Sequence, residues 1–185
     1  LKFDVIIIGG DLLDSDRFNF YDLAVFKKFA KPIFFVTGNH ELYLKNWSEI
    51  KNKLNDFNIK LIDKQSFQIH EINFIGIGEG TLEDQKKELE NQNFKSGVFN
   101  LIIVHKPLLW KYCSKKIDLM LSGHTHNGQI FPFNLLVKMK FPNVYGLYQK
   151  ENSKLYVSSG SGCWGPKIRI GSKNEIICIT ISNQI

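Results

Sequence analysis

The chain has 185 residues, of which 43% are hydrophobic and 23% charged, and its formal net charge is +6 at pH 7. This composition suits one globular domain over residues 1–185, and no apolar run reaches the roughly 18 residues that a membrane-spanning helix needs. A basic balance favours anionic partners, but the sequence has no aromatic RNA-binding motif or arginine-rich arm, and therefore no specific nucleic-acid signal.

Short apolar runs alternate with helical patterns along the chain. The expected strands are β-branched or aromatic runs that stop at glycine or polar residues, at 5–8, 33–36, 67–71, 74–77, 101–104, 118–121, 155–158 and 176–181. The expected helices carry apolar residues at helical spacing, at 18–30, 47–57 and 81–92. Thr81 and Asp84 have capping-box spacing at the start of the third helix. Helices between the early strands and a strand-rich end predict a layered α/β fold with mixed sheets.

Four of these strands end in residues that bind metals well. They are Asp11 and Asp14 after the first, Asn39 and His40 after the second, His105 after the third, and His124 and His126 after the fourth. Since functional residues gather at the carboxyl ends of strands in open α/β sheets, we expect these side chains at one rim. Imidazole suits Zn and Fe, and carboxylate and amide oxygens suit Mn and Mg. The pattern therefore predicts a pair of divalent ions that clamp a phosphate, with Asp11 as the candidate bridge.

Each motif alone has a plain interpretation as turn chemistry or polar surface. The ordered series Gly-Asp-x-x-Asp, Gly-Asn-His-Glu, Val-His-x-Pro and Gly-His-Thr-His is much more specific, and it resembles the motifs of the calcineurin-like metallophosphoesterase superfamily. Residues 123–130, 145–148, 157–162 and 166–169 further resemble bacterial phosphodiesterases of the YaeI and YkuE type. The resemblance implies a four-layer α-β-β-α sandwich of two mixed β-sheets flanked by helices.

The resemblance also implies the metal ligands. Asp11 would bridge two divalent ions, which could be Mn, Fe, Zn or Mg. Asn39, His105 and His124 would complete the shell of one ion, and His126 would belong to the other.

For catalysis, the resemblance implies that His40 is a general acid and that Asp14 orients its ring. A histidine that donates a proton needs a partner that fixes its tautomer, which independently favours this pairing. The implied reaction is hydrolysis of a phosphodiester, pyrophosphate or phosphomonoester bond by attack of metal-bound hydroxide. A phosphodiesterase is favoured, and the substrate could be lipid-linked or nucleotide-linked.

One family motif is not matched. The family begins with an Asp-x-His motif on a strand before Gly-Asp-x-x-Asp, whereas this chain has only ten residues before Asp11. Only Asp11 and His126 would then serve the second ion. We therefore expect a domain truncated at its N-terminus, with its first strand missing, and a chain that alone binds at most one metal tightly and is poorly active. The alternative is a non-catalytic binding or scaffold module with a degenerate metal site.

Two further features have two interpretations each, and the remaining ones have one. Residues 131–148, rich in Phe, Leu and Lys, could be a buried loop-and-strand segment, which is favoured, or a membrane-facing flap. Arg169 could reach a substrate phosphate or be a plain surface arginine. His70 is expected to be exposed and inert. The three scattered cysteines favour a reducing compartment. With no visible signal peptide, we expect a cytoplasmic or membrane-peripheral location, and an upstream anchor would not be visible in this chain.

Overall fold

Short runs of Ile, Phe, Val and Leu form two β-sheets in the computed structural model, which describes residues 2–113 and 115–182. The first sheet has three parallel strands in the order β1-β2-β3. The second has six strands in the order β4-β5-β6-β7-β9-β8, parallel in its interior and antiparallel at both edges. The bounds are β1 (Ile6–Ile8), β2 (Ile33–Phe35), β3 (Ile59–Leu61), β4 (Gln65–Ile69), β5 (Ile72–Ile77), β6 (Phe99–Val104), β7 (Leu119–Ser122), β8 (Gly146–Lys150) and β9 (Ser153–Val157).

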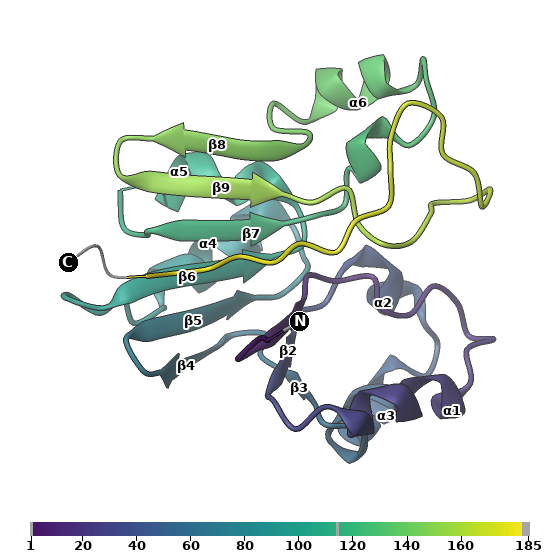
Figure 1. Cartoon of the computed structure of the whole chain (residues 1–185), viewed down its shortest axis with the longest axis horizontal. Helices are drawn as coiled ribbons and strands as arrows, with labels where there is room; N and C mark the ends of the chain where they lie inside the picture. Colours follow the sequence, from purple (N-terminus) through teal and green to yellow (C-terminus); the bar gives the residue numbers. More distant parts are fainter. Residues whose placement is uncertain (1, 114, 183–185) are drawn as a thin grey trace.

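Helices cover the outer face of each sheet (Figure 1). Those packed on the first sheet are α1 (Phe20–Leu23), η1 (Ala24–Lys28), α3 (Trp47–Lys53) and η2 (Leu54–Phe57). Those packed on the second sheet are α4 (Leu82–Glu90), η3 (Pro107–Leu109) and α5 (Trp110–Cys113). Three short helices lie beyond the strand ends: α2 (Asn39–Tyr43), η4 (His126–Gly128) and α6 (Asn134–Lys140).

The central strands are apolar throughout because both of their faces are buried. In β2, Ile33 and Phe35 pack against the helices of the first sheet, whereas Phe34 packs between the two sheets. In β6, Ile102 faces α4 and α5, whereas Ile103 packs between the sheets. This alternation produces continuous hydrophobic runs in place of the polar-apolar pattern of a half-exposed strand. The result is an α-β-β-α arrangement of two sheets flanked by helices, as the resemblance implied.

Most expected elements are present, with shifted ends. Thr81 caps α4 as the spacing predicts, because its Oγ1 accepts from the Asp84 amide at 3.2 Å. The helix expected at 18–30 is reduced to α1 and the 3-10 turn η1. The terminal strand expected at 176–181 is wrong, since those residues form no ladder in the described part of the chain. Ile181 still packs onto the core between the sheets, so the apolar residues of this run reflect a packing contact rather than strand pairing.

The favoured interpretation of residues 131–148 as a buried segment is also wrong over its first half. Residues 134–140 form helix α6, which has no buried residue. Only the second half fits the expectation, with Phe141 and Val144 buried and β8 paired to β9. None of the described helices is long and apolar enough to cross a membrane.

Candidate metal centre

Three candidate ligand residues, each following a different strand, meet at the carboxyl edge of the sheets. Asp11 follows β1, His105 follows β6 and His124 follows β7, and one ligand atom from each lies within 4.8 Å of the other two. His105 Nε2 is 3.0 Å from Asp11 Oδ2 and 3.0 Å from His124 Nδ1. β6 and β7 are parallel neighbours in the second sheet, and β1 belongs to the first sheet. The loops that follow the three strands deliver these atoms to one point.

The protonation of this cluster favours a cation at its centre. His105 Nδ1 donates to the Gly9 carbonyl at 2.8 Å, so the Nε2 atom of a neutral His105 presents a lone pair to Asp11 and His124. Lone pairs that face one another at this distance repel unless a proton or a metal ion lies among them.

The pKa values of the cluster agree with this. Burial opposes its charge, but the hydrogen bond and charge of Asp11 raise the pKa of His105 above its ordinary value. Burial likewise opposes ionisation of Asp11, but its contacts with His105 and His40 lower its pKa to about 2. Burial, and then the charge of His105, lower the pKa of His124 to about 3. Ionised carboxylate with neutral imidazole is the state that binds metals, and a divalent ion would fit among these atoms.

Asn39 supplies independent support for a cation-binding site. Its Oδ1 atom is buried and has no hydrogen-bond partner among the described residues. The next residue, His40, donates its backbone amide to Asp11 Oδ1 at 2.9 Å, so the Asn39 loop lies directly against the cluster. A buried carbonyl oxygen without a partner is costly, and a metal ion is one way to satisfy it.

Glu41, a residue that the sequence analysis did not single out, connects the loops beneath the cluster. It is fully buried, and its carboxylate accepts three backbone N–H groups: Gly38 at 2.7 Å, Leu13 at 2.9 Å and Asp11 at 3.0 Å. These bonds tie the loop after β1 to the loop after β2. They also help to hold Asp11 in the left-handed region, at φ 54. The motif Gly-Asn-His-Glu could have indicated this role, because an acidic residue beside candidate metal ligands often holds their loops in place through hydrogen bonds.

Two glycines allow the loops to approach this closely. A Cβ atom on Gly10, which lies at φ 98, would overlap the ring of His105. A Cβ atom on Gly38 would overlap the carboxylate of Asp11. The glycines of both motifs are thus needed for the position of the ligands rather than only for a turn.

His40 lies between two carboxylates at the edge of the cluster. Its Nδ1 is 2.8 Å from Asp14 Oδ1, and its Nε2 is 3.9 Å from Asp11 Oδ2. The Asp14 carboxylate accepts from Nδ1–H, which fixes the tautomer and directs Nε2 toward the centre. The roles of His40 as general acid and of Asp14 as its orienting partner remain predictions.

His126 lies near the cluster but outside the group of three. Burial, and then the charge of Arg169, lower the pKa of His126, whereas the charge of Asp11 opposes this lowering. Arg169 Nη2 lies 3.1 Å from His126 Nδ1, and a guanidinium can only donate, so Nδ1 is the acceptor. The neutral ring then carries its proton on Nε2. Metal binding by His126 through Nδ1 therefore requires Arg169 to release that atom.

Arg169 joins several loops in this arrangement. Its guanidinium donates to the carbonyls of His126 at 3.0 Å and Ser159 at 2.7 Å, and also to that of Gly162 at 2.5 Å. Its Nε is buried without a partner among the described residues. A contact between Arg169 and a substrate phosphate remains a prediction.

The loop that carries both C-terminal histidines is strained and held from outside. Four non-glycine residues within six positions have positive φ: His124, His126, Asn127 and Gln129. Such backbone persists only where the surroundings fix it, and it concentrates at functional sites. Here the Gln129 side chain both accepts from the Trp164 amide at 2.6 Å and donates to the Trp164 carbonyl at 2.7 Å. Residues 159–173 therefore hold the histidine loop, defined as residues 123–129, in place.

The fold and the site define a class of protein: an α/β sandwich that gathers carboxylate, carboxamide and imidazole ligands at its strand ends for divalent metal. Residues 1–128 match the family model described as calcineurin-like phosphoesterase. The chain belongs to the calcineurin-like phosphoesterase family, which implies divalent metal ions and phosphate-ester substrates.

The relatives agree with this assignment. An uncharacterized metallophosphoesterase of Campylobacter jejuni is 32% identical over 98% of this chain and 51% of its own length. The Bacillus subtilis metallophosphoesterase YkoQ is 29% identical over 94% of this chain and 70% of its own length. A bovine transmembrane protein with metallophosphoesterase domain is 31% identical over 95% of this chain and 45% of its own length. The chain spans about half the length of the Campylobacter and bovine relatives.

Proposed function

We propose that this chain is a metal-dependent phosphoric ester hydrolase, with a phosphodiester as the favoured substrate and a pyrophosphate or phosphomonoester as the other candidates. The observation that carries the proposal is the convergence of Asp11, His105 and His124 within 4.8 Å, beside the unpartnered oxygen of Asn39. Family membership supports the reaction class. The proposed unit is a single phosphoesterase domain.

Two divalent ions, Mn, Fe, Zn or Mg, are the proposed cofactors. Asp11, Asn39, His105 and His124 would hold one ion, and Asp11 with His126 would contribute to the other. When bound, such ions supply Lewis acidity to the phosphoryl oxygens and lower the pKa of a water molecule that attacks the phosphorus. The donor set of carboxylate, carboxamide and imidazole suits these borderline and hard ions.

His40 would protonate the leaving oxygen. Its Nδ1 proton is held by Asp14 at 2.8 Å, so Nε2 is the atom available to donate a proton toward the centre. A positioned general acid accelerates such a step by about 10²–10⁴. His40 and Asp14 thus act on the substrate rather than on the metal ions, which separates their loss from ligand loss in experiments.

The second candidate function is a binding or scaffold module without turnover. The observation that favours it is the contact between Arg169 and His126 Nδ1, because a ring nitrogen held by arginine is not free for the second ion. One ion alone could still bind a phosphate group without hydrolysing it.

A lipid-linked or nucleotide-linked substrate is the proposed class, and the bovine relative, a transmembrane protein with metallophosphoesterase domain, supports a membrane setting. The three cysteines, all free thiols, support a reducing compartment and hence a cytoplasmic or membrane-peripheral location.

Hydrolysis of bis-p-nitrophenyl phosphate and p-nitrophenyl phosphate by the Mn²⁺-loaded chain tests the proposal. We expect slow turnover of the diester, because Asp11 and His126 are few ligands for the second ion. Chelation should abolish the turnover, and His40→Ala should reduce it by about 10²–10⁴ with metal content kept. His70→Ala is the matched control, because His70 is the one histidine outside the strand-end motifs and is exposed. Metal binding without any turnover would favour the scaffold function. Loss of the metal ions in His40→Ala would contradict the role assigned to that residue.

A further inference from the structure

Helix α6 and the loop beside it form an exposed apolar lobe. We define the α6 lobe as residues 131–140 together with residues 163–171. Met139 is 84% exposed, and α6 has no buried residue. The large apolar side chains of the lobe that are half or more exposed are Phe131, Phe133, Leu135, Leu136, Met139, Trp164, Ile168 and Ile170.

Hydrogen bonds join the two segments of the lobe into one unit. The Phe131 amide donates to the Ile170 carbonyl at 2.8 Å, and Ile130 and Ile170 form a parallel bridge. The Gln129 side chain bonds the backbone of Trp164 in both directions. The two segments therefore form one unit that carries the exposed side chains. Proteins seldom leave so many large apolar side chains together in water unless that surface has a partner.

The charge of the lobe indicates the chemistry of that partner. Lys138, Lys140 and Lys167 are exposed on it, and residues 131–140 and 163–171 contain no Asp or Glu. Apolar side chains flanked by lysine are typical of segments that lie in the interface of an anionic membrane. Two copies of the lobe would instead place like charges against each other. We propose that the α6 lobe docks onto an anionic phospholipid surface.

Docking by the lobe would place the metal centre at the membrane. The Phe141 ring, at the end of α6, packs on the ring of His124 with centroids 5.2 Å apart, and Thr125 Oγ1 donates to the Val144 carbonyl. These contacts join the histidine loop directly to the segment that follows helix α6. The consequence that the phosphoester substrate is presented at the bilayer surface rests on the proposed function, whereas the docking itself does not.

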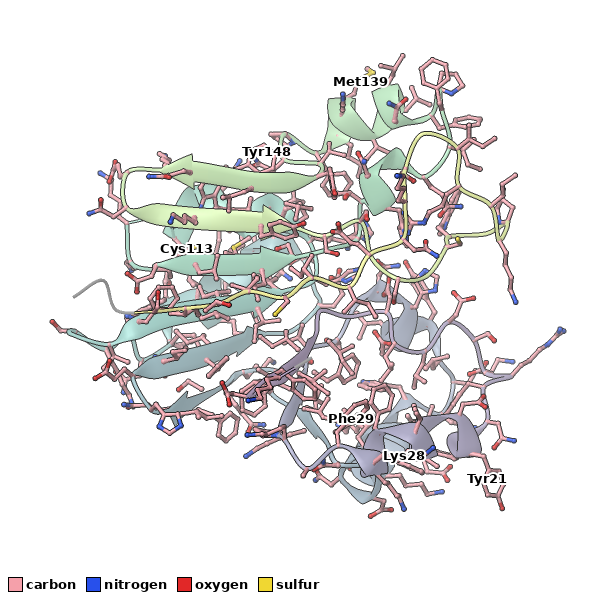
Figure 2. All side chains as sticks on the ribbon, in the orientation of Figure 1. Tyr21, Lys28, Phe29, Cys113, Met139 and Tyr148 are labelled. Carbon is pink, nitrogen blue, oxygen red and sulfur yellow. The ribbon has the colours of Figure 1, made fainter. Side chains whose placement is uncertain are left out.

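Flotation with lipid vesicles tests the docking without any enzyme assay. The purified chain should float with vesicles in which about a third of the lipid is phosphatidylglycerol and the rest phosphatidylcholine, and should stay largely behind with phosphatidylcholine alone. Met139→Glu should weaken binding by about tenfold or more, because it removes an apolar insertion and adds a like charge. Tyr21→Glu is the matched control, since Tyr21 is also 84% exposed but lies at the opposite end of the molecule (Figure 2).

The electrostatic part has its own variant pair. Each lysine near an anionic surface contributes about fivefold to binding, so Lys138→Gln with Lys140→Gln should weaken it about 25-fold. Lys27→Gln with Lys28→Gln removes the same charge from η1 at the far end and should have little effect (Figure 2).

Other outcomes would overturn the proposal. Equal binding of Met139→Glu and Tyr21→Glu would show that the lobe is not the contact. A wild-type chain that binds neither vesicle type and forms dimers that Met139→Glu dissociates would be a further such outcome. That result would show that a second copy of the chain, not a membrane, covers the lobe. Because hydrolysis of a water-soluble ester is measured separately, failure of docking and failure of the hydrolase proposal are distinguishable.

Discussion

Replacement of Glu41 tests how the cluster is held in place. The carboxylate accepts three backbone amides, two on Oε2 (Gly38 and Asp11) and one on Oε1 (Leu13). A glutamine that keeps its oxygen toward Gly38 and Asp11 would turn its amino group toward the Leu13 N–H. One hydrogen bond is then lost and two donors face each other in a buried position, which costs about 2–3 kcal/mol.

Alanine at position 41 removes all three bonds and should cost more. Hydrogen bonds to a charged group contribute about 1.5–3 kcal/mol each, although losses at one site do not add fully. We expect about 4–6 kcal/mol for Glu41→Ala, which is enough to unfold a domain of ordinary stability. Glu41→Gln is therefore the informative variant, since it should fold and still show the defect.

Urea unfolding of wild-type protein, Glu41→Gln and Glu49→Gln measures the difference. Glu49 is exposed and paired only with Lys53 on the surface of α3, so its replacement should change the free energy of unfolding by less than about 0.5 kcal/mol. Glu41→Gln should also bind Mn²⁺ more weakly, because the Asp11 loop loses support. Equal stability of the two variants would refute the assignment of Glu41 as the residue that joins the loops.

Three further predictions concern a glycine, the thiols and a carboxylate. Gly10→Ala should destabilise the fold and weaken metal binding, because the added Cβ overlaps the imidazole ring of His105. Gly97→Ala, also at positive φ but in open space, should destabilise the fold without any effect on metal binding. Burial raises the pKa of Cys113 to about 12, so this thiol should resist iodoacetamide up to about pH 10, while the exposed Cys178 reacts; mass spectrometry of labelled peptides distinguishes them, and equal labelling would contradict the burial. Asp14→Ala should lower kcat for the diester by about tenfold with metal content unchanged, and a loss of metal ions would instead make Asp14 a ligand.

The strands that position the site could be predicted from sequence because both of their faces are buried. Runs such as residues 33–36 and 101–104 are apolar without interruption, and each ends at a polar residue. A buried strand and the start of its loop are therefore visible together. The convergence of Asp11, His105 and His124 follows from the shared direction of their strands, and that direction was inferred from the fold class.

The parts that could not be predicted depend on contacts between distant segments. Whether 131–140 is buried depends on whether another element covers it, and the same residues fit either state. The partner of Arg169 is the histidine loop 43 residues earlier, and no local pattern indicates that contact. The three bonds of Glu41 likewise join two loops that are separate in sequence. The terminal run 176–181 has strand-like composition but finds no strand to pair with among the described residues.

Metal titration by calorimetry, with metal content measured by atomic emission, tests the central claim most directly. We predict that the wild-type chain and His70→Ala bind Mn²⁺ with the same affinity, and that His124→Ala and Asn39→Ala lose at least about 100-fold. Circular dichroism would establish that both variants fold. Unchanged affinity in a folded His124→Ala, or no metal binding by the wild-type chain, would contradict the assignment of this strand edge as a metal centre.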